Sequence, residues 1–296
     1  MRDDVGVRVA VGDVRLFFDV DGCGVVADGA RMTRRPTLVL LHGGPGADHS
    51  LFKPEFATMT DMAQVVYLDQ RGSGRSDRGD PRDWTWQRWA DDVAGLCAIL
   101  GITDPVLVGS SSGALVAMAC AHRHPGLVAG LVLDSALGTP TTLEDTLAVF
   151  ERRGGPRARE AARRYLGGDM STAATNSWER YALRLYGGSS ADGDLSVRRE
   201  RALINDEVQT HFRLGRCGPS DATVYVGTIS CPTLILAGLD DPVSPAVGAT
   251  ALAASITNAD VRLETFSGVG HGTFRQDPVR AFTSLRGFLN NFARAA

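Results

Sequence analysis

The chain has 296 residues, of which 44% are hydrophobic and 22% charged, and its formal net charge is −3. These values are ordinary for a globular protein with one large core or two smaller ones. The sequence has no basic block of the kind that binds nucleic acid, and no apolar run reaches the roughly 18–20 residues that span a bilayer. We therefore expect neither a nucleic-acid partner nor a membrane partner.

The cysteines and the first residues bear on the cellular compartment. The five cysteines are odd in number, scattered and without a C-x-x-C pair (Cys23, Cys97, Cys120, Cys217 and Cys231). The first four residues are polar and acidic, unlike the apolar stretch of a signal peptide. Both features predict a cytoplasmic protein with reduced thiols.

Up to about residue 136, short β-rich runs alternate with helical patterns. The two runs at residues 5–11 and 14–20 predict a hairpin that turns at Gly12-Asp13. Continuous apolar runs predict strands buried on both faces at residues 37–41, 64–68, 106–108 and 131–133. Helical patterns follow at about residues 84–100 and 112–124. Strands that alternate with helices predict a mostly parallel sheet with helices on both faces.

Residues 137–225 have a different pattern. They contain no convincing strand, and Gly-Gly pairs at 154–155, 167–168 and 187–188 predict several short helices. The first pattern then returns, with predicted strands at 233–237 and 261–265 and predicted helices at about 246–256 and 278–293. We predict an α/β core formed by residues 1–136 and 226–296, into which residues 137–225 are inserted as a helical cap.

A Gly-x-Ser-x-Gly motif joins a predicted strand to a predicted helix. It reads Gly109-Ser110-Ser111-Ser112-Gly113, and only Ser111 has glycine two residues before and two residues after it. In this context the motif is typical of a nucleophile elbow, a tight turn that lifts the central serine above the sheet. The motif therefore predicts Ser111 as a nucleophile placed at a helix N-terminus, where developing negative charge is favoured.

A glycine-rich loop follows the strand at residues 37–41 and reads His42-Gly43-Gly44-Pro45-Gly46. Acyl transfer requires preorganised N–H donors for the oxyanion. We expect the backbone N–H groups of Gly44 and Ser112 to supply them. We interpret His42 as a residue that shapes this loop, because it precedes the nucleophile in the chain.

The order Ser–Asp–His is completed by two later loops. Asp240 and Asp241 follow the strand at 233–237, and His271 follows the strand at 261–265. A serine nucleophile needs a base, and that base needs a carboxylate to orient it. Both aspartates are candidates for that carboxylate, and the Gly-x-x-Asp spacing from Gly238 favours Asp241.

Together these motifs resemble the proline iminopeptidase family. The glycine-rich loop, the segment from Asp69 to Ser76 (DQRGSGRS) and the serine elbow carry the resemblance, which covers most of the chain outside the predicted cap. The resemblance implies an α/β-hydrolase fold with a helical cap after the sixth strand. It also implies metal-free and cofactor-free hydrolysis of the amide that follows an unblocked N-terminal residue. In the DQRGSGRS segment we expect Asp69 and Arg71 to cross-brace a turn.

Two departures bear on the substrate. The family's elbow usually reads Gly-Gly-Ser-Trp-Gly, whereas this chain has Ser110 and Ser112 at the variable positions, which predicts a wider acyl pocket. The family binds the substrate's amine through acidic cap residues. Gly218-Pro219-Ser220-Asp221 resembles a Gly-Pro-Asn-Glu stretch of tricorn-interacting aminopeptidases, which makes Asp221 one candidate, and Glu207 is the other.

The sequence thus predicts a serine aminopeptidase or amidase that acts on a peptide or an aminoacylated small metabolite with a free amine. The alternative is an esterase, thioesterase or lactonase with the same triad and no amine site. A non-catalytic binding protein is a third class, against which the complete set of Ser, Asp, His and oxyanion loops argues.

Overall fold

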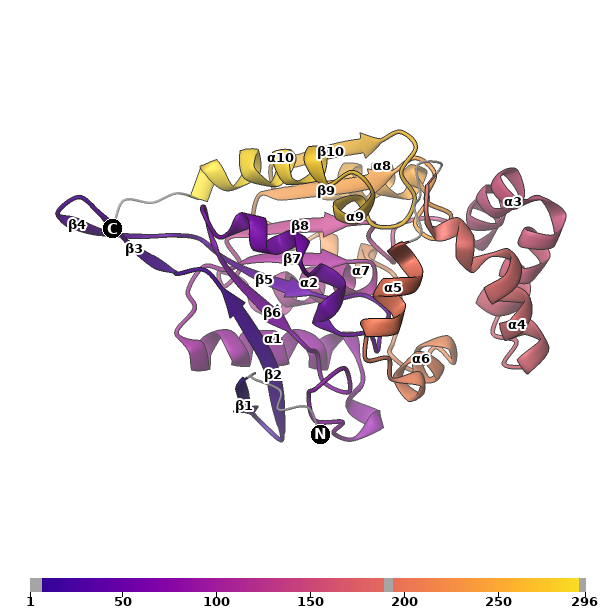
Figure 1. The fold of residues 1–296 in the computed structure, drawn as a ribbon, viewed down its shortest axis with the longest axis horizontal. Helices are drawn as coiled ribbons and strands as arrows, with labels where there is room; N and C mark the ends of the chain where they lie inside the picture. Colours follow the sequence, from indigo (N-terminus) through magenta and orange to yellow (C-terminus); the bar gives the residue numbers. More distant parts are fainter. Residues whose placement is uncertain (1–6, 189–193, 293–296) are drawn as a thin grey trace.

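A computed structural model describes residues 7–188 and 194–292 of the chain. Its main sheet has eight strands in the order β1-β2-β6-β5-β7-β8-β9-β10 (Figure 1). Strands β1 and β2 pair antiparallel, β2 pairs antiparallel with β6, and the other neighbours are parallel. The bounds of these strands are Val7–Val11 (β1), Val14–Asp21 (β2), Thr37–Leu41 (β5), Gln64–Leu68 (β6), Val106–Ser110 (β7), Gly130–Asp134 (β8), Thr233–Gly238 (β9) and Val261–Phe266 (β10).

The predicted mostly parallel sheet with helices on both faces is confirmed. Successive residues of β5 point to opposite faces: Leu38 and Leu40 join one apolar cluster, and Val39 and Leu41 join the other. One cluster includes helices α1, α2, α7 and α8, which span Trp86–Leu100, Ser112–Arg123, Thr223–Val226 and Ala246–Ser255. The other includes the short η1 (His49–Phe52) and η2 (Glu55–Met59), α9 (Thr273–Gln276) and α10 (Pro278–Leu289). Residues 5, 6 and 293 of the predicted elements lie outside the described residues.

Between β8 and β9 the chain is helical, as predicted. Helix α3 (Leu143–Leu166) bends at Gly155, whose φ of 75° interrupts the helix. Helices α4 (Thr172–Tyr181), α5 (Asp194–Arg201) and α6 (Asp206–Arg213) follow, with η4 (Leu183–Tyr186) after α4. Helices α3 and α4 share a small apolar core of their own around Phe150 and Trp178. In Figure 1 they lie beyond the ends toward which the parallel strands point, and α5 and α6 lie nearer the sheet.

Two features at the edges of these units were not anticipated from the sequence. Strands β3 (Val25–Asp28) and β4 (Arg31–Arg34) form a separate two-stranded hairpin. Their side chains are mostly exposed and lack the apolar alternation that predicts a half-buried strand. Helix α7 spans the predicted boundary at residue 225 and packs against α2 and α8. Among the described helices, none combines the length and apolar character that crossing a bilayer requires.

Candidate active site

The turn between β7 and α2 has the geometry of the predicted elbow. Ser111 has φ 55° and ψ −119°, a conformation that non-glycine residues rarely adopt. A Cβ on Gly109 would lie 2.4 Å from the carbonyl oxygen of Gly113, and one on Gly113 would lie 2.0 Å from that of Leu41. The two glycines are therefore required by close backbone packing. This packing holds Ser111 at the wall of a cavity.

The three consecutive serines have different environments. The hydroxyl of Ser110 donates to Asp134 Oδ2 at 3.1 Å, although Ser110 also borders the cavity. Ser112 is buried at the first position of α2. Its backbone N–H belongs to the first helical turn, which has no acceptor within the helix. The geometry thus leaves Ser111 as the candidate nucleophile and Ser112 N–H as a candidate oxyanion donor.

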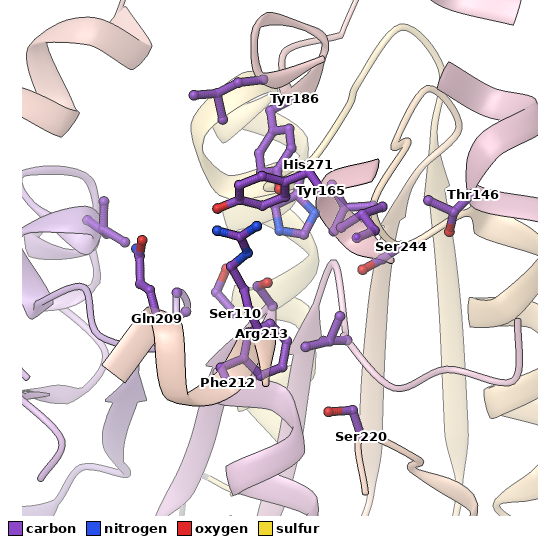
Figure 2. Close-up of a pocket in the computed structure, with 18 of the residues that line it drawn as sticks. Ser110, Thr146, Tyr165, Tyr186, Gln209, Phe212, Arg213, Ser220, Ser244 and His271 are labelled. Atoms are coloured by element: carbon purple, nitrogen blue, oxygen red, sulfur yellow. The ribbon is translucent and has the colours of Figure 1, made fainter. Parts of the chain in front are cut away.

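His271 and Asp241 form a buried pair. His271 Nδ1 lies 2.9 Å from Asp241 Oδ2, and the other oxygen of Asp241 accepts from the backbone N–H groups of Val243 and Ser244 at 2.8 and 2.9 Å. His271 lines the same cavity as Ser111. Figure 2 shows His271 in this cavity, close to Tyr186. Asp240 is only half-buried and meets the histidine loop through its backbone N–H, which donates to Val269 O at 2.9 Å. Of the two candidate aspartates, the structure brings Asp241 to the histidine.

The glycine-rich loop packs directly on the elbow. A Cβ on Gly43 would lie 2.9 Å from Ser111 Cβ, and Gly44, with φ 123°, lines the cavity. His42 Nδ1 lies 2.9 Å from Gly43 O, and Gln70 N donates to His42 Nε2 at 3.2 Å. These two bonds require a neutral ring with the proton on Nδ1, and burial lowers the pKa of His42, which favours that form. His42 therefore organises the loop, as the sequence indicates.

In the DQRGSGRS segment, Asp69 and Arg71 each brace the turn through partners of their own. Arg71 does not pair with Asp69. It is fully buried and binds Asp92 at 2.8 Å and Asp13 at 2.9 Å. Asp69 Oδ2 accepts from the backbone N–H of Arg75 within the turn at 2.8 Å, and Oδ1 accepts from the backbone N–H and the Nδ1 of His49 at 2.8 and 2.7 Å. Both acidic partners of Arg71 lie in other elements, and residue spacing alone does not reveal them.

Two buried groups beside the site were missed by the sequence analysis. Asp134, at the end of β8, accepts from Ser110 and from the backbone N–H and hydroxyl of Thr273 at 2.9 and 2.7 Å. Burial raises the pKa of Asp134. Ser135 Oγ accepts from Gly272 N at 2.8 Å. The position of Asp134 at a strand end beside the elbow strand was the available signal, because polar groups there meet at one sheet edge.

Residues 186–188, at and just after the end of η4, hold the loop that carries His271, here called the histidine loop. The carbonyl of Tyr186 accepts from His271 N at 2.7 Å, and the Tyr186 ring lies edge-on to the imidazole with 5.2 Å between centroids. The Gln276 side chain accepts from Gly188 N and Gly270 N at 2.6 and 2.8 Å. Arg153 of α3 donates to the carbonyls of Asp240 and Gly187, each at 2.5 Å. The inserted helical segment thus helps to build the site.

The cavity between the sheet and the helical segment has a volume of about 1090 Å³. The two predicted amine-binding residues, Glu207 and Asp221, do not line it, and both side chains are exposed. Asp221 Oδ1 accepts from the N–H and hydroxyl of Thr223 at the start of α7. The ionisable residues of the Asp, Glu, His and Arg types that line the cavity are Glu55, Asp134, Glu179, Arg184, Asp206, Arg213, His271 and Arg275.

Helix α6 explains why Asp206 lines the cavity and Glu207 does not. Asp206, Gln209, Thr210 and Arg213 follow the i, i+3, i+4, i+7 spacing of one helix face, and all four line the cavity. The start of α6 is bonded to the glycine-rich loop, because Asn205 N donates to Gly46 O at 2.7 Å.

Comparisons with known proteins agree with this architecture. A family model described as alpha/beta hydrolase fold matches residues 36–278. The chain is 28% identical over 277 residues to a proline iminopeptidase of Clostridium botulinum, which covers 86% of this chain and 89% of the relative. The solved structure of a proline iminopeptidase from Mycobacterium smegmatis matches with a TM-score of 0.75 and 20% identity, over 97% of this chain and 98% of that one.

A thermophilic esterase from Thermogutta terrifontis also matches, with a TM-score of 0.67 and 26% identity over 98% of this chain and 99% of the other. The resemblance to proline iminopeptidases is confirmed, and an esterase shares the fold. The chain belongs to the alpha/beta hydrolase fold family.

Proposed function

We propose that the protein is a serine hydrolase in which Ser111, His271 and Asp241 form the catalytic triad. The observation that carries this proposal is the buried Asp241–His271 pair, whose histidine lines the same cavity as a serine held in the elbow conformation. The bond to Asp241 occupies Nδ1 of His271 and leaves Nε2 to act on the serine hydroxyl.

The proposed reaction is an acyl transfer in two steps. His271 Nε2 takes the proton of Ser111 as Oγ bonds to the carbonyl carbon, and the N–H groups of Gly44 and Ser112 stabilise the oxyanion. His271 then gives that proton to the leaving nitrogen, the C–N bond breaks, and an acyl-enzyme remains. A water molecule attacks this ester with the same base, releases the acid and restores Ser111.

For the substrate, we propose an amide that follows an unblocked aminoacyl residue. The likeness to proline iminopeptidases and the acids in the cavity support this reading. Because Glu207 and Asp221 lie outside the cavity, we propose Asp206 for the ammonium, with Glu179 as a second lining acid. Glu55 also lines the cavity but is already ion-paired with Arg198. Peptides and aminoacylated small metabolites both fit a cavity of about 1090 Å³.

All five cysteines are free, which agrees with a cytoplasmic location.

The second candidate is an esterase, thioesterase or lactonase with the same triad. The esterase of 26% identity, and Ser112 in place of the tryptophan usual at this elbow position in proline iminopeptidases, favour it. The two candidates differ in one requirement, since only the first needs a free amine on the substrate.

A substrate panel separates them. We expect hydrolysis of aminoacyl arylamides, no hydrolysis after N-acetylation, and slower hydrolysis of neutral acyl esters. Ser111→Ala should lower kcat by about 10⁴-fold or more, while Ser110→Ala should retain most activity.

Asp206→Asn should lower kcat/KM for aminoacyl arylamides by about tenfold or more, because the ammonium loses its partner. Glu207→Gln is the matched control, since it removes the neighbouring carboxylate outside the cavity. Efficient cleavage of N-acetylated substrates would leave only the esterase candidate.

A further inference from the structure

Arg213 places a guanidinium inside the cavity. It is the last residue of α6, and its guanidinium carbon lies 3.8 Å from the centroid of the Tyr165 ring. Figure 2 shows this group beneath Tyr165, in the same pocket as Ser110 and His271. Stacking on an aromatic ring fixes the plane of a guanidinium and leaves its edges free for ligands.

The charge of Arg213 has no carboxylate partner among the described residues. Its Nη2 donates to the backbone carbonyl of Asp169 at 2.6 Å, and its Nε is buried without a hydrogen-bond partner. The Asp169 carboxylate pairs instead with Arg164 at 2.7 Å. Cations that are taken partly out of water are normally paired, because desolvation is costly. An uncompensated, oriented guanidinium in a cavity therefore indicates an anionic ligand.

The same helix face carries the opposite charge at its other end. Asp206 begins α6 and Arg213 ends it, and Gln209 and Thr210 line the cavity between them. Seven residues of α-helix separate their backbones by about 10 Å. A dipeptide is about 7 Å long when extended, which is of the same order as this backbone separation. The cavity face of α6 thus presents an acid at one end and a base at the other, a charge arrangement that suits a short zwitterion.

We propose that Arg213 binds the carboxylate of the leaving group, and that the substrates are aminoacyl amino acids of about dipeptide size. This inference rests on the proposed function, because it takes the other end of the substrate to be a free amine near Asp206.

The test compares a dipeptide with its uncharged analogue. Alanyl-alanine and alanyl-alaninamide differ only in the terminal charge, and release of alanine or alaninamide is followed by chromatography. We expect the wild type to prefer the dipeptide in kcat/KM by about 10- to 100-fold, the range of a charged hydrogen bond. Arg213→Gln should abolish this preference while keeping activity on the amide, and Arg213→Lys should retain part of it.

Arg180→Gln is the matched control. Arg180 also stacks on a tyrosine, with its guanidinium carbon 5.4 Å from the Tyr181 ring centroid, but it does not line the cavity. This variant should keep the wild-type preference. A wild type that lacks the preference would overturn the proposal. So would an Arg213→Gln variant that loses both activities equally, which would indicate a structural brace between α6 and Asp169.

A parallel pair of esters separates this inference from the proposed function. Monomethyl succinate carries a carboxylate and dimethyl succinate does not. If the enzyme cleaves only esters and prefers the monoester through Arg213, the carboxylate site stands and the aminopeptidase proposal fails. If the enzyme cleaves alanyl-alaninamide and alanyl-alanine equally well, the aminopeptidase proposal stands and the carboxylate site fails. Calorimetric titration of Ser111→Ala with the two peptides gives the same comparison without turnover.

Discussion

At the scale of single residues, Asp134 is a buried carboxylate beside the candidate nucleophile. Its two oxygens accept three hydrogen bonds, from Ser110 and from the N–H and hydroxyl of Thr273. Burial nevertheless raises its pKa above the ordinary value of 3.8, because these bonds do not replace full hydration. When the pKa of a carboxyl is higher in the folded than in the unfolded state, the free energy of unfolding falls as pH rises from the unfolded pKa to the folded one.

We therefore predict that Asp134→Asn gains stability relative to the wild type as pH rises. The amide keeps an acceptor for Thr273 and can donate to Ser110, but it never ionises. The difference in Tm between variant and wild type should grow from about pH 4, the unfolded pKa of Asp, up to the raised folded pKa. Thermal unfolding over a pH series measures it. Asp134→Ala, which leaves the Thr273 N–H and hydroxyl without that acceptor, should be less stable at every pH. A pH-independent difference between Asn and wild type would contradict the assignment.

Local spacing was sufficient for some residues of the site and not for others. Ser111, Asp241 and His271 each sit in a short motif after a predicted strand, so their approximate placement follows from the topology. Asp134 and Arg213 have no such motif. Thr273, which binds Asp134, lies 139 residues away in the chain, and Arg213 is recognisable only from the ring stacked on it.

At the scale of elements, the loop that carries His271 is held mainly by backbone groups of the inserted segment. Gln276 joins the two, since its carboxamide accepts from Gly188 N and Gly270 N and donates to Tyr186 O and His271 O at 3.2 and 3.0 Å. The position of the His271 imidazole therefore depends on the side chain of Gln276, which does not itself line the cavity.

We expect Gln276→Ala to lower kcat more than it raises KM. Small displacements of a catalytic group cost up to about 100-fold in rate, and four bonds that orient the His271 loop are lost together. Steady-state kinetics on the best substrate of the panel measure the split. Asn258→Ala is a matched control, because its amide also donates to a backbone carbonyl, that of Gly227, but on the exposed surface. Equal kcat values in the two variants would show that Gln276 does not position the histidine.

Element types followed from periodicity, whereas their mutual contacts did not. The apolar runs identified β5 and β6, because both faces of these strands are buried. The exposed hairpin of β3 and β4 lacks such a run. The clamp on the histidine loop depends on close backbone approach, since a Cβ on Gly188 would lie 1.9 Å from the Gly268 carbonyl oxygen. The Gly-Gly pair at 187–188 predicted only a break between helices, and it did not predict this contact with the histidine loop.

At the scale of the whole molecule, Arg71 joins three distant parts of the core. Its guanidinium binds Asp92 on α1 through Nε and Nη2, both at 2.8 Å, and Asp13 in the β1–β2 turn. Asp92 is almost fully buried, and burial raises its pKa despite the pairing. The ion pair is thus a point where removal of one partner leaves a charge inside the protein.

We predict that Arg71→Met lowers the free energy of unfolding by roughly 3–5 kcal/mol, the usual cost of removing one partner of a buried ion pair. Arg71→Met combined with Asp92→Leu should recover a large part of this loss, because no charge then remains unpaired. Urea unfolding of the two variants and the wild type tests this. A double variant less stable than Arg71→Met alone would mean that packing, rather than the unpaired charge, dominates.

The hold of the inserted segment on the histidine loop has a consequence for how this enzyme can diversify. The contacts of His271 N with Tyr186 O and of Arg153 with Gly187 O end on main-chain carbonyls, which any amino acid provides. We therefore expect sequence drift to be tolerated over α4, and over α3 except at Arg153, as long as the chain path at residues 185–188 is kept. Libraries that aim at new substrates should randomise the cavity-facing positions of α4 and α6 and leave that short stretch untouched. Exchange of the whole insertion for that of a relative should succeed only when the donor follows the same path past the histidine.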